Sequence, residues 1–260
     1  MQFVKLTPEN LDTEHICCAI SNNRDPQVAS KKAWLKDRLD EGLVFLKSTE
    51  RGKCFIEYLP AEAAWVPIEA GGYMHINCFW VSGNLKGHGY ANDLLAACMQ
   101  DCREKGKRGV TVISSPKKQP FLSDPKYLAY KGFQVADRAE PFFTLLYMPF
   151  EPDAPVPHFL PQVKQPHIDE PGFVIYYTSG CPFTAKYVPL IEAAAKEAGI
   201  PFQSRFIDSR EAAQNVPAAW TNYALFYNGA FVTHEILSVK KFLALAGKGS
   251  ETVPDGLLGR

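Results

Sequence analysis

Apolar and polar residues alternate in short stretches along most of the chain, and segments with helical spacing separate these stretches. The alternating stretches, rich in aromatic and β-branched residues, predict strands at 1–7, 43–47, 53–59, 73–81, 109–115, 132–137 and 142–150. Amphipathic spacing and helix-start signals predict helices at 8–20, 28–41, 90–105 and from Ser123. Strands and helices in this order predict a mixed α/β (α+β) layer protein.

The pattern resumes after residue 172 in a shorter unit. We expect the order βαβ and then ββα there, with elements at 173–179, 184–198, 201–208, 223–227, 230–234 and from Ser238. Asn228-Gly229 between two apolar runs is a strong hairpin signal. Between the two units, residues 151–171 carry six prolines, which favour an extended path over a surface. The sequence therefore predicts a domain over 1–150, a linker over 151–171 and a second domain over 172–250.

Composition and charge exclude several classes of protein. The 260 residues are 46% hydrophobic and 22% charged, which excludes global disorder. Lys and Arg together number 28, as do Asp and Glu, so the net charge is zero and we expect no nucleic-acid surface. No apolar run approaches the roughly 18–20 residues that cross a bilayer, and the N-terminal stretch turns polar too early for a signal peptide. We expect a cytoplasmic protein that does not bind membranes.

Seven cysteines are scattered along the chain, an odd number that suits reduced thiols rather than a disulfide framework. Cys98 and Cys102 stand four residues apart on a predicted helix, a spacing compatible with shared metal ligation. No histidine or second cysteine pair stands nearby in the sequence, and cysteine is often a small buried apolar residue. We expect plain packing for this pair and for Cys17 and Cys18, and no metal.

A glycine-containing loop, Asn84–Ala91, lies between a predicted strand and a long predicted helix. Gly87 and Gly89 let the backbone turn tightly and approach a ligand, and the helix N-terminus offers unpaired N–H groups and a partial positive charge. Together these features predict a cradle for a pyrophosphate. The spacing matches neither a P-loop nor the G-x-G-x-x-G dinucleotide fingerprint. A turn that serves packing alone is the alternative interpretation.

The order of elements, with this loop after the fourth strand, resembles the GNAT (GCN5-related N-acetyltransferase) superfamily. The family signature there is Gln/Arg-x-x-Gly-x-Gly/Ala, and Asn84-x-x-Gly87-x-Gly89 matches its glycines but not its first position. The stretches FIEYLPAEAAWVPI, INCFWVSGNLKGHGYANDLL and KYLAYKGF are similar to the GNAT subgroup with a YoaP-like C-terminal extension. The resemblance implies acetyl transfer from acetyl-CoA, as co-substrate, to a small-molecule or peptide amine. Strand and helix edges often support dimers in this family, so a homodimer is one possible assembly.

The resemblance also implies which residues hold the co-substrate. The backbone amides of Leu85, Lys86, Gly87, His88, Gly89 and Tyr90 are expected to bind its pyrophosphate. Phe79, Trp80 and Val81, at the end of the preceding strand, are expected to pair with the pantetheine arm as an added strand does. Their amides would then polarise the thioester carbonyl. The Lys86 ammonium either neutralises phosphate charge or is simply solvated.

Acetyl transfer needs an acid for the departing thiolate and a base for the amine. Many GNAT enzymes use a tyrosine four residues before a Gly-Phe pair, and Leu128 stands there in this chain. Tyr127 and Tyr130 flank it, and we prefer Tyr127 as the acid. Glu57 and His75 are the candidate bases.

Strand alternation places four residues of 73–81 on one face, Tyr73, His75, Asn77 and Phe79, and four on the other, Met74, Ile76, Cys78 and Trp80. His75 and Asn77 on a shared face predict a polar cleft wall. A hydrogen-bonded structural histidine is the alternative for His75. Glu62 is expected in a loop, with plain surface charge as the simplest interpretation, and Lys31-Lys32 is expected on a solvated helix face.

The second unit resembles the thioredoxin/glutaredoxin fold, with Cys181 at the mouth of its first helix. A helix N-terminus lowers the pKa of a thiol, so Cys181 is a possible nucleophile. Thr184 replaces the second cysteine of a C-x-x-C pair, and Thr221–Tyr223 stand where that fold carries a cis-proline. Cys181 is therefore either reactive as a monothiol or part of a domain that recruits substrate.

Three functions follow from these features. The first is a GNAT-type N-acetyltransferase. The second is a thiol-redox or substrate-recruiting thioredoxin-like protein centred on Cys181, with a CoA-binding regulatory half. The third is a CoA-responsive binding module without catalysis.

Overall fold

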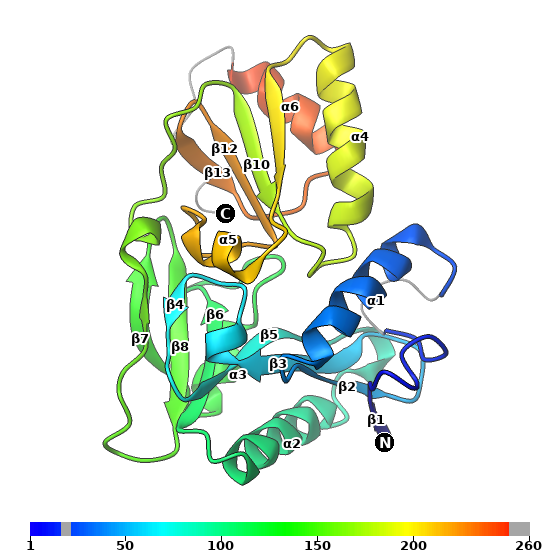
Figure 1. Cartoon of the computed structure of the whole chain (residues 1–260), viewed down its shortest axis with the longest axis vertical. Coiled ribbons are helices and arrows are strands. Elements are labelled where there is room, and N and C mark those ends of the chain that lie inside the picture. Colours follow the sequence, from blue (N-terminus) through cyan, green and yellow to red (C-terminus); the bar gives the residue numbers. More distant parts are fainter. Residues whose placement is uncertain (17–21, 250–260) are drawn as a thin grey trace.

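The computed structural model describes residues 1–16 and 22–249, which form two larger β-sheets with flanking helices and a small two-stranded sheet (Figure 1). The larger sheet has seven strands in the order β1-β2-β3-β5-β6-β8-β7. They span Phe3–Lys5 (β1), Val44–Ser48 (β2), Cys54–Pro60 (β3), Tyr73–Val81 (β5), Gly109–Ser114 (β6), Gln134–Ala139 (β7) and Phe143–Pro149 (β8). Neighbouring strands are antiparallel except β5 and β6, which are parallel. The predicted mixed α/β class is confirmed.

Helices cover both faces of this sheet. One face packs against α1 (Pro26–Leu39), and the opposite face packs against α2 (Tyr90–Glu104) and α3 (Pro125–Tyr130). The Asp25 side chain accepts a hydrogen bond from the N–H of Gln27 and so begins α1. On α2, Cys98 and Cys102 are fully buried in the core, with their sulfur atoms 3.9 Å apart. This position confirms that they pack as apolar residues.

The helix predicted at 8–20 is wrong over the described part of that segment, where residues 8–14 form turns instead. Asn10 explains the difference, because its side chain bonds to the backbone on both sides. Its Oδ1 accepts the N–H of Thr7 at 2.9 Å, and its Nδ2 donates to the carbonyl of Lys5 at 3.0 Å. Cys17 and Cys18, predicted to pack, lie outside the described residues.

The second domain contains a four-stranded sheet in the order β11-β10-β12-β13. Its strands and helices span Phe173–Tyr177 (β10), Thr184–Glu197 (α4), Phe202–Phe206 (β11), Arg210–Asn215 (α5), Tyr223–Tyr227 (β12), Ala230–Thr233 (β13) and Val239–Gly249 (α6). The strands β10 and β11 are parallel, and β12 and β13 form an antiparallel hairpin. Asn228 and Gly229 both have positive φ (47° and 88°), as a tight type I′ turn requires. The predicted order of elements is confirmed.

The proline-rich segment lies partly in the core rather than wholly on the surface. Its strand β9 (His158–Phe159) pairs with β4 (Ile68–Glu69) of the first domain. A 3-10 turn, η3 (Pro161–Val163), follows. Phe159 and Val163 are both almost completely buried, because they complete the core of the first domain. The expectation of a path over a surface is therefore wrong at these residues.

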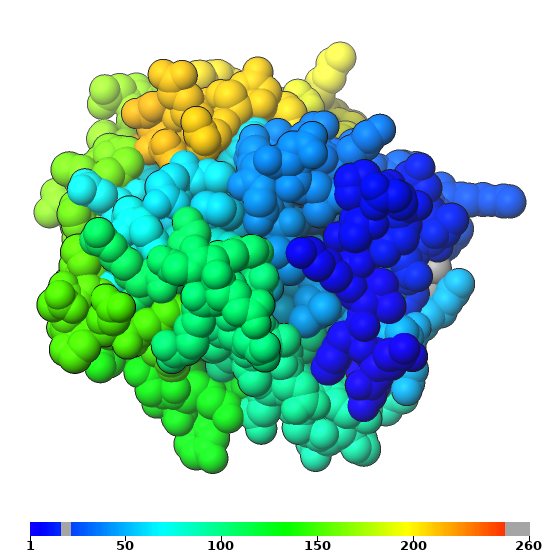
Figure 2. Space-filling model, turned by 60° about the horizontal axis from the view of Figure 1, so that its bottom comes forward, coloured from blue at the N-terminus to red at the C-terminus, as the bar shows by residue number. Residues whose placement is uncertain are grey.

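The two domains share their hydrophobic cores. Trp220 of the second domain belongs to the core cluster of the first, and Trp65 of the first belongs to a cluster built by the second. The Thr221 hydroxyl donates to the carbonyl of Trp65 at 2.5 Å. The second domain lies on the α1 side of the larger sheet (Figure 1), so the face that carries α2 is formed mostly by the first domain (Figure 2). Among the helices in the described ranges, none has the length and apolar character needed to cross a bilayer.

Candidate active site

A groove of about 830 Å³ opens where β5 and β6 separate. The end of β5, the loop at 82–89 and the start of α2 form one side of it. The loop at 118–124 and Tyr127 form the other side. Trp220 of the second domain lines its inner end. The groove therefore reaches from the glycine loop to the boundary between the domains.

A β-bulge explains why the two parallel strands separate. The strands β5 and β6 pair only from Tyr73 to Ile76 of β5. Directly after this point the register between β3 and β5 shifts, and Asn77 is the extra residue in β5. A bulge bends its strand and increases the local twist. The β6-facing edge of the remaining residues of β5 is consequently without a partner strand in the described structure, and Phe79–Val81 line the groove.

The bulge also reverses the alternation of side chains along β5. Cys78 and Trp80 pack on the same core cluster as Tyr73, while Phe79 and Val81 pack on the cluster behind α2. The simple alternation predicted across 73–81 is therefore wrong beyond Asn77. An extra residue in a strand shifts every later side chain to the opposite face.

The glycine loop presents free backbone N–H groups to the groove, starting at Gly87. The amides of Leu85 and Lys86 bond instead to the carbonyls of Ser82 and Gly83 within a short 3-10 turn, η2 (Gly83–Leu85). In the described structure, no backbone acceptor is bonded to the N–H groups from Gly87 to Gly89, and Tyr90 begins α2. Of the amides predicted to bind a pyrophosphate, those of Leu85 and Lys86 are therefore already bonded within the loop.

Both glycines of the loop have φ of +82°, and a Cβ added to either meets nothing within 4 Å. The bare backbone therefore faces open space. The Lys86 side chain is exposed and lines the groove. The His88 ring bonds to the carbonyl of Asn84 at 3.1 Å and stacks on Tyr90. Tyr90 lines the groove, whereas His88 is not among its lining residues in the described structure.

Of the two candidate acids, the structure brings Tyr127 to the groove. Its hydroxyl donates to Oδ1 of Asn92 at 3.2 Å. Burial raises the pKa of Tyr127 to about 12, and the charge of Asp93 acts in the same direction. Tyr130 is 82% exposed, away from the groove, and Leu128 is buried in the core.

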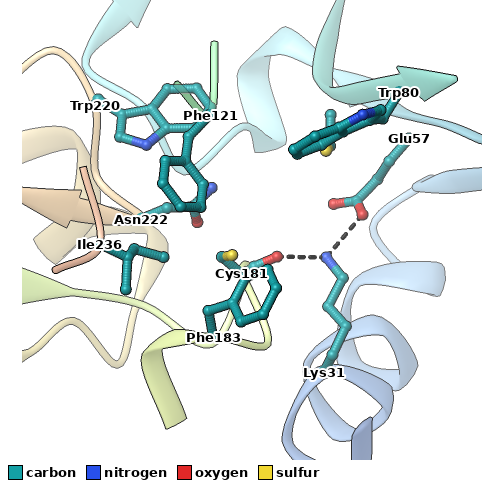
Figure 3. A pocket seen from close by; sticks show the side chains of 11 residues that line it. Lys31, Glu57, Trp80, Phe121, Cys181, Phe183, Trp220, Asn222 and Ile236 are labelled. Carbon is teal, nitrogen blue, oxygen red and sulfur yellow. Dashed lines mark hydrogen bonds and ion pairs between the residues drawn. The ribbon is translucent and has the colours of Figure 1, made fainter. Parts of the chain in front are cut away.

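Glu57, one of the candidate bases, is fully buried on β3 and lines a small cavity between the domains (Figure 3). Its Oε2 accepts a hydrogen bond from Lys31 Nζ at 2.7 Å, and its Oε1 accepts one from Asn77 Nδ2 at 2.5 Å. Lys31 Nζ also donates to the carbonyl of Gly180 at 2.7 Å. The expectation that Lys31 lies on a solvated helix face is wrong, since its side chain is 1% exposed. Both ions are taken out of water and held by fixed partners.

His75, the other candidate base, does not line the groove in the described structure. Its Nδ1 bonds to the hydroxyl of Thr111 at 3.0 Å, and its ring is completely buried. Burial lowers the pKa of His75 to about 3, so the imidazole is neutral at ordinary pH. Its position corresponds to a hydrogen-bonded structural histidine rather than a cleft wall. Glu62 is about half exposed and accepts the N–H of Gly72, away from the groove.

Cys181 lies on the cavity opposite Glu57, at the mouth of α4 (Figure 3). Burial raises the pKa of its thiol to about 11, which outweighs the backbone N–H of Phe183 and the charge of Lys31. The direction of this shift is opposite to the one that a helix N-terminus alone predicts. Burial also raises the pKa of Cys78 on the same cavity. Both groups are therefore thiols, not thiolates, at neutral pH.

Sequence reasoning missed three residues that the structure brings to this region. Phe121 and Trp220 line both the groove and the small cavity, and Lys31 lines the cavity. The two aromatic residues lie in loops, where periodicity gives no signal. The charge of Lys31 suggested that its side chain is exposed to solvent. Only the tertiary contacts between the domains reveal them.

Comparison with known proteins gives two family models that match this chain. A model described as acetyltransferase (GNAT) family matches residues 9–120, and one described as YoaP-like matches residues 201–243. The chain is 44% identical over 243 residues to a Bacillus subtilis (strain 168) protein named "Uncharacterized N-acetyltransferase YoaP". The match covers 93% of this chain and 97% of that protein.

Some solved structures are similar to part of this chain. A putative GNAT acetyltransferase from Desulfovibrio desulfuricans is 17% identical, with a TM-score of 0.41, and the match covers 57% of this chain and 98% of that one. The yncA protein of Salmonella typhimurium, a putative acetyltransferase solved with acetyl-CoA, is 15% identical, with a TM-score of 0.42. That match covers 60% of this chain and 96% of the Salmonella chain.

Proposed function

Since this chain belongs to the acetyltransferase (GNAT) family, we propose that it transfers the acetyl group of acetyl-CoA to a primary amine of a small molecule or peptide. The observation that carries the proposal is the groove between β5 and β6. It has free backbone amides at one end and a hydrogen-bonded tyrosine along its side. Acetyl-CoA supplies an acetyl group that is activated as a thioester.

The residues of the glycine loop fit a diphosphate. The N–H groups from Gly87 to Gly89 bond to no backbone acceptor in the described structure, and a Cβ on Gly87 or Gly89 would enter open space beside them and the N-terminus of α2. Such a nest of amides at the start of a helix favours an anion. The exposed Lys86 adds a positive charge beside it. The free edge of β5 at Phe79–Val81 offers N–H and C=O groups to an extended pantetheine arm, as an edge strand does to a peptide.

Two side chains handle the protons. The Tyr127 hydroxyl, protonated at neutral pH because its pKa is raised to about 12, donates towards the departing thiolate. The Glu57 carboxylate lines the small cavity beside the groove, where Lys31 and Asn77 fix its orientation, and it takes the proton of the incoming amine. The second domain closes this cavity and excludes bulk water.

Two further features bear on the alternatives. The raised pKa of Cys181 does not favour the thiol-redox interpretation, because a thiol is a poor nucleophile. Cys78, Cys98, Cys102 and Cys181 carry thiols that are not joined in disulfides, which fits a reducing compartment such as the cytoplasm.

Calorimetric titration with acetyl-CoA tests the proposal. We expect saturable binding by the native chain, and a loss of affinity of at least about 100-fold in Gly87→Glu and in Gly89→Glu, because each variant places a carboxylate against the diphosphate. Gly106→Glu is the matched control. Gly106 also has positive φ (+63°) and open space at its Cβ, but it lies beyond the far end of α2. No saturable binding by the native chain, or equal affinities in all four proteins, contradicts the proposal.

A further inference from the structure

We propose that the cavity between the domains is the acceptor site and that it selects a primary amine carried on a flat aromatic group. The proposal deepens the proposed acetyl transfer and rests on it. Four aromatic side chains surround this cavity, which we call the aromatic chamber: Trp80, Phe121, Phe183 and Trp220. Trp80 comes from β5 and Phe121 from the loop at 115–124, while the other two come from the second domain.

The aromatic chamber adjoins the groove. Trp80, Phe121 and Trp220 line both spaces, and Cys78 does too. Figure 3 shows Trp80 across the space from Phe121 and Trp220, with the Glu57 carboxylate beside Trp80. Glu57 pairs with Cys78 of β5, and Cys78 lines the groove, so an amine held against Glu57 lies beside the groove. Flat rings on opposite sides of a narrow space favour a flat apolar guest.

The charges of the aromatic chamber exclude other kinds of acceptor. Of the eleven residues that line it, Lys31 and Glu57 carry the formal charges, and they neutralise each other at 2.7 Å. Lys31 Nζ is further occupied by the carbonyl of Gly180 and lies 4.2 Å from the ring centroid of Trp34. No cation is left there for a carboxylate or phosphate on the acceptor. A single carboxylate also cannot hold the several charges of a polyamine.

Glu57 and Asn222 provide the polar contacts that an aromatic amine needs. Each carboxylate oxygen of Glu57 accepts one hydrogen bond in the described structure, from Lys31 or from Asn77. A carboxylate oxygen has two acceptor positions, so one more is available for an ammonium. Asn222 uses its Oδ1 to accept the Thr178 hydroxyl at 2.7 Å, which leaves its amide nitrogen to donate to the guest.

Phe121 separates the aromatic chamber from the groove. The cavity measures about 30 Å³, room for one water, so a guest has to displace a side chain. Phe121 has a φ of +63°, a strained conformation for a bulky residue. It packs edge-on against Phe183, with ring centroids 6.4 Å apart. Turning the Phe121 ring aside would join the two spaces, since the ring lines both of them.

The test compares four amines as acceptors with acetyl-CoA: 2-phenylethylamine, butylamine, spermidine and glutamate, with the N-acetyl product measured by mass spectrometry. We expect kcat/KM for 2-phenylethylamine to exceed that of each other amine at least about tenfold. Phe183→Ala should lower kcat/KM for 2-phenylethylamine about tenfold and that for butylamine less than about threefold. Calorimetric affinity for 2-phenylethylamine without acetyl-CoA should fall by the same factor. Phe206→Ala, on the exposed edge of the same domain (52% exposed), is the matched control and should change neither.

Acetyl-CoA titration of the same preparations separates the two proposals. If the native chain fails to bind acetyl-CoA, the proposed function fails. If it binds acetyl-CoA but acetylates butylamine, spermidine or glutamate as well as 2-phenylethylamine, or acetylates and binds none of the four, only the aromatic acceptor is overturned. Equal effects of Phe183→Ala on 2-phenylethylamine and butylamine overturn it as well.

Discussion

Burial decides what the titratable side chains near the groove can do. Tyr127 and Tyr130 are both on α3, three residues apart, yet the first lines the groove and the second is 82% exposed. His75 and Glu57 are both buried, but only Glu57 has a charged partner and reaches a cavity. At Cys181, desolvation of the thiolate raises the pKa by more than the nearby helix N-terminus lowers it. Sequence reasoning could nominate these residues but could not rank them, since exposure depends on the tertiary structure.

Replacing Tyr127 by Phe should lower kcat at least about tenfold at pH 7.5, because it removes a proton donor to the thiolate. The affinity for acetyl-CoA should stay within about twofold, because the ring remains. The pKa of Tyr127 is raised to about 12, so its hydroxyl stays protonated from pH 7 to 10. The native kcat should therefore not fall with rising pH in that range through loss of this proton. Steady-state kinetics across this pH range measure both effects.

Tyr130→Phe is the matched control for this variant, because it makes the same chemical change on the same helix at an exposed residue. It should leave kcat unchanged. Equal kcat values for Tyr127→Phe and the native chain would exclude Tyr127 as the acid.

Single elements were largely predictable where local signals agree. Asp25 and Pro26 mark the start of α1, and Asn228-Gly229 marks the hairpin between β12 and β13. Prediction failed where a contact outside the element decides the structure. The bulge at Asn77 depends on the pairing of β3 with β5. The face of the sheet on which Trp80 lies could therefore not be predicted from alternation. Phe159 is buried because β9 pairs with β4, although prolines surround it in the sequence.

Three elements meet at Lys31, so this residue should matter for stability. Its ammonium joins α1 to Glu57 on β3 and to the carbonyl of Gly180 at the end of the loop after β10. Lys31→Met leaves the buried carboxylate of Glu57 without its cation. We expect the free energy of unfolding to fall by about 3–5 kcal/mol, measured by urea unfolding at pH 7.

The matched control is Lys105→Met, which breaks the exposed ion pair between Lys105 and Asp101. That change should alter the free energy of unfolding by less than about 1 kcal/mol. Losses of similar size in the two variants would show that the buried pair does not hold the three elements together.

At the scale of the whole molecule, the family was predicted from sequence and is confirmed by the relative that is 44% identical. The order of elements was predicted too, apart from the helix at 8–20, which is wrong over residues 8–14. The way the domains pack was not predicted. Trp65 and Trp220 each enter the core of the other domain, and nothing in their local sequence distinguishes them from other buried tryptophans. The resemblance of the second domain to thioredoxin remains a prediction.

Shared cores predict that the two domains unfold together. Trp65→Ala removes a large ring from the cluster that the second domain builds and from its edge-on contact with Trp34, whose ring centroid is 6.2 Å away. We expect one calorimetric transition in the native chain and in the variant, with the free energy of unfolding lowered by about 3–5 kcal/mol. Phe206→Ala, at an exposed site, should leave the transition nearly unchanged. Two separate transitions, with only one displaced by Trp65→Ala, would contradict this prediction.

The division of the aromatic chamber between two domains has an evolutionary consequence. The loop that would bind the nucleotide lies between residues 83 and 90, whereas Phe183 and Trp220 lie much later in the sequence. Selection can therefore change the residues at 183 and 220, and with them the amine that is accepted, while the glycine loop continues to bind acetyl-CoA. Relatives with the same glycine loop should diverge in what they modify according to the residues they carry at 183 and 220.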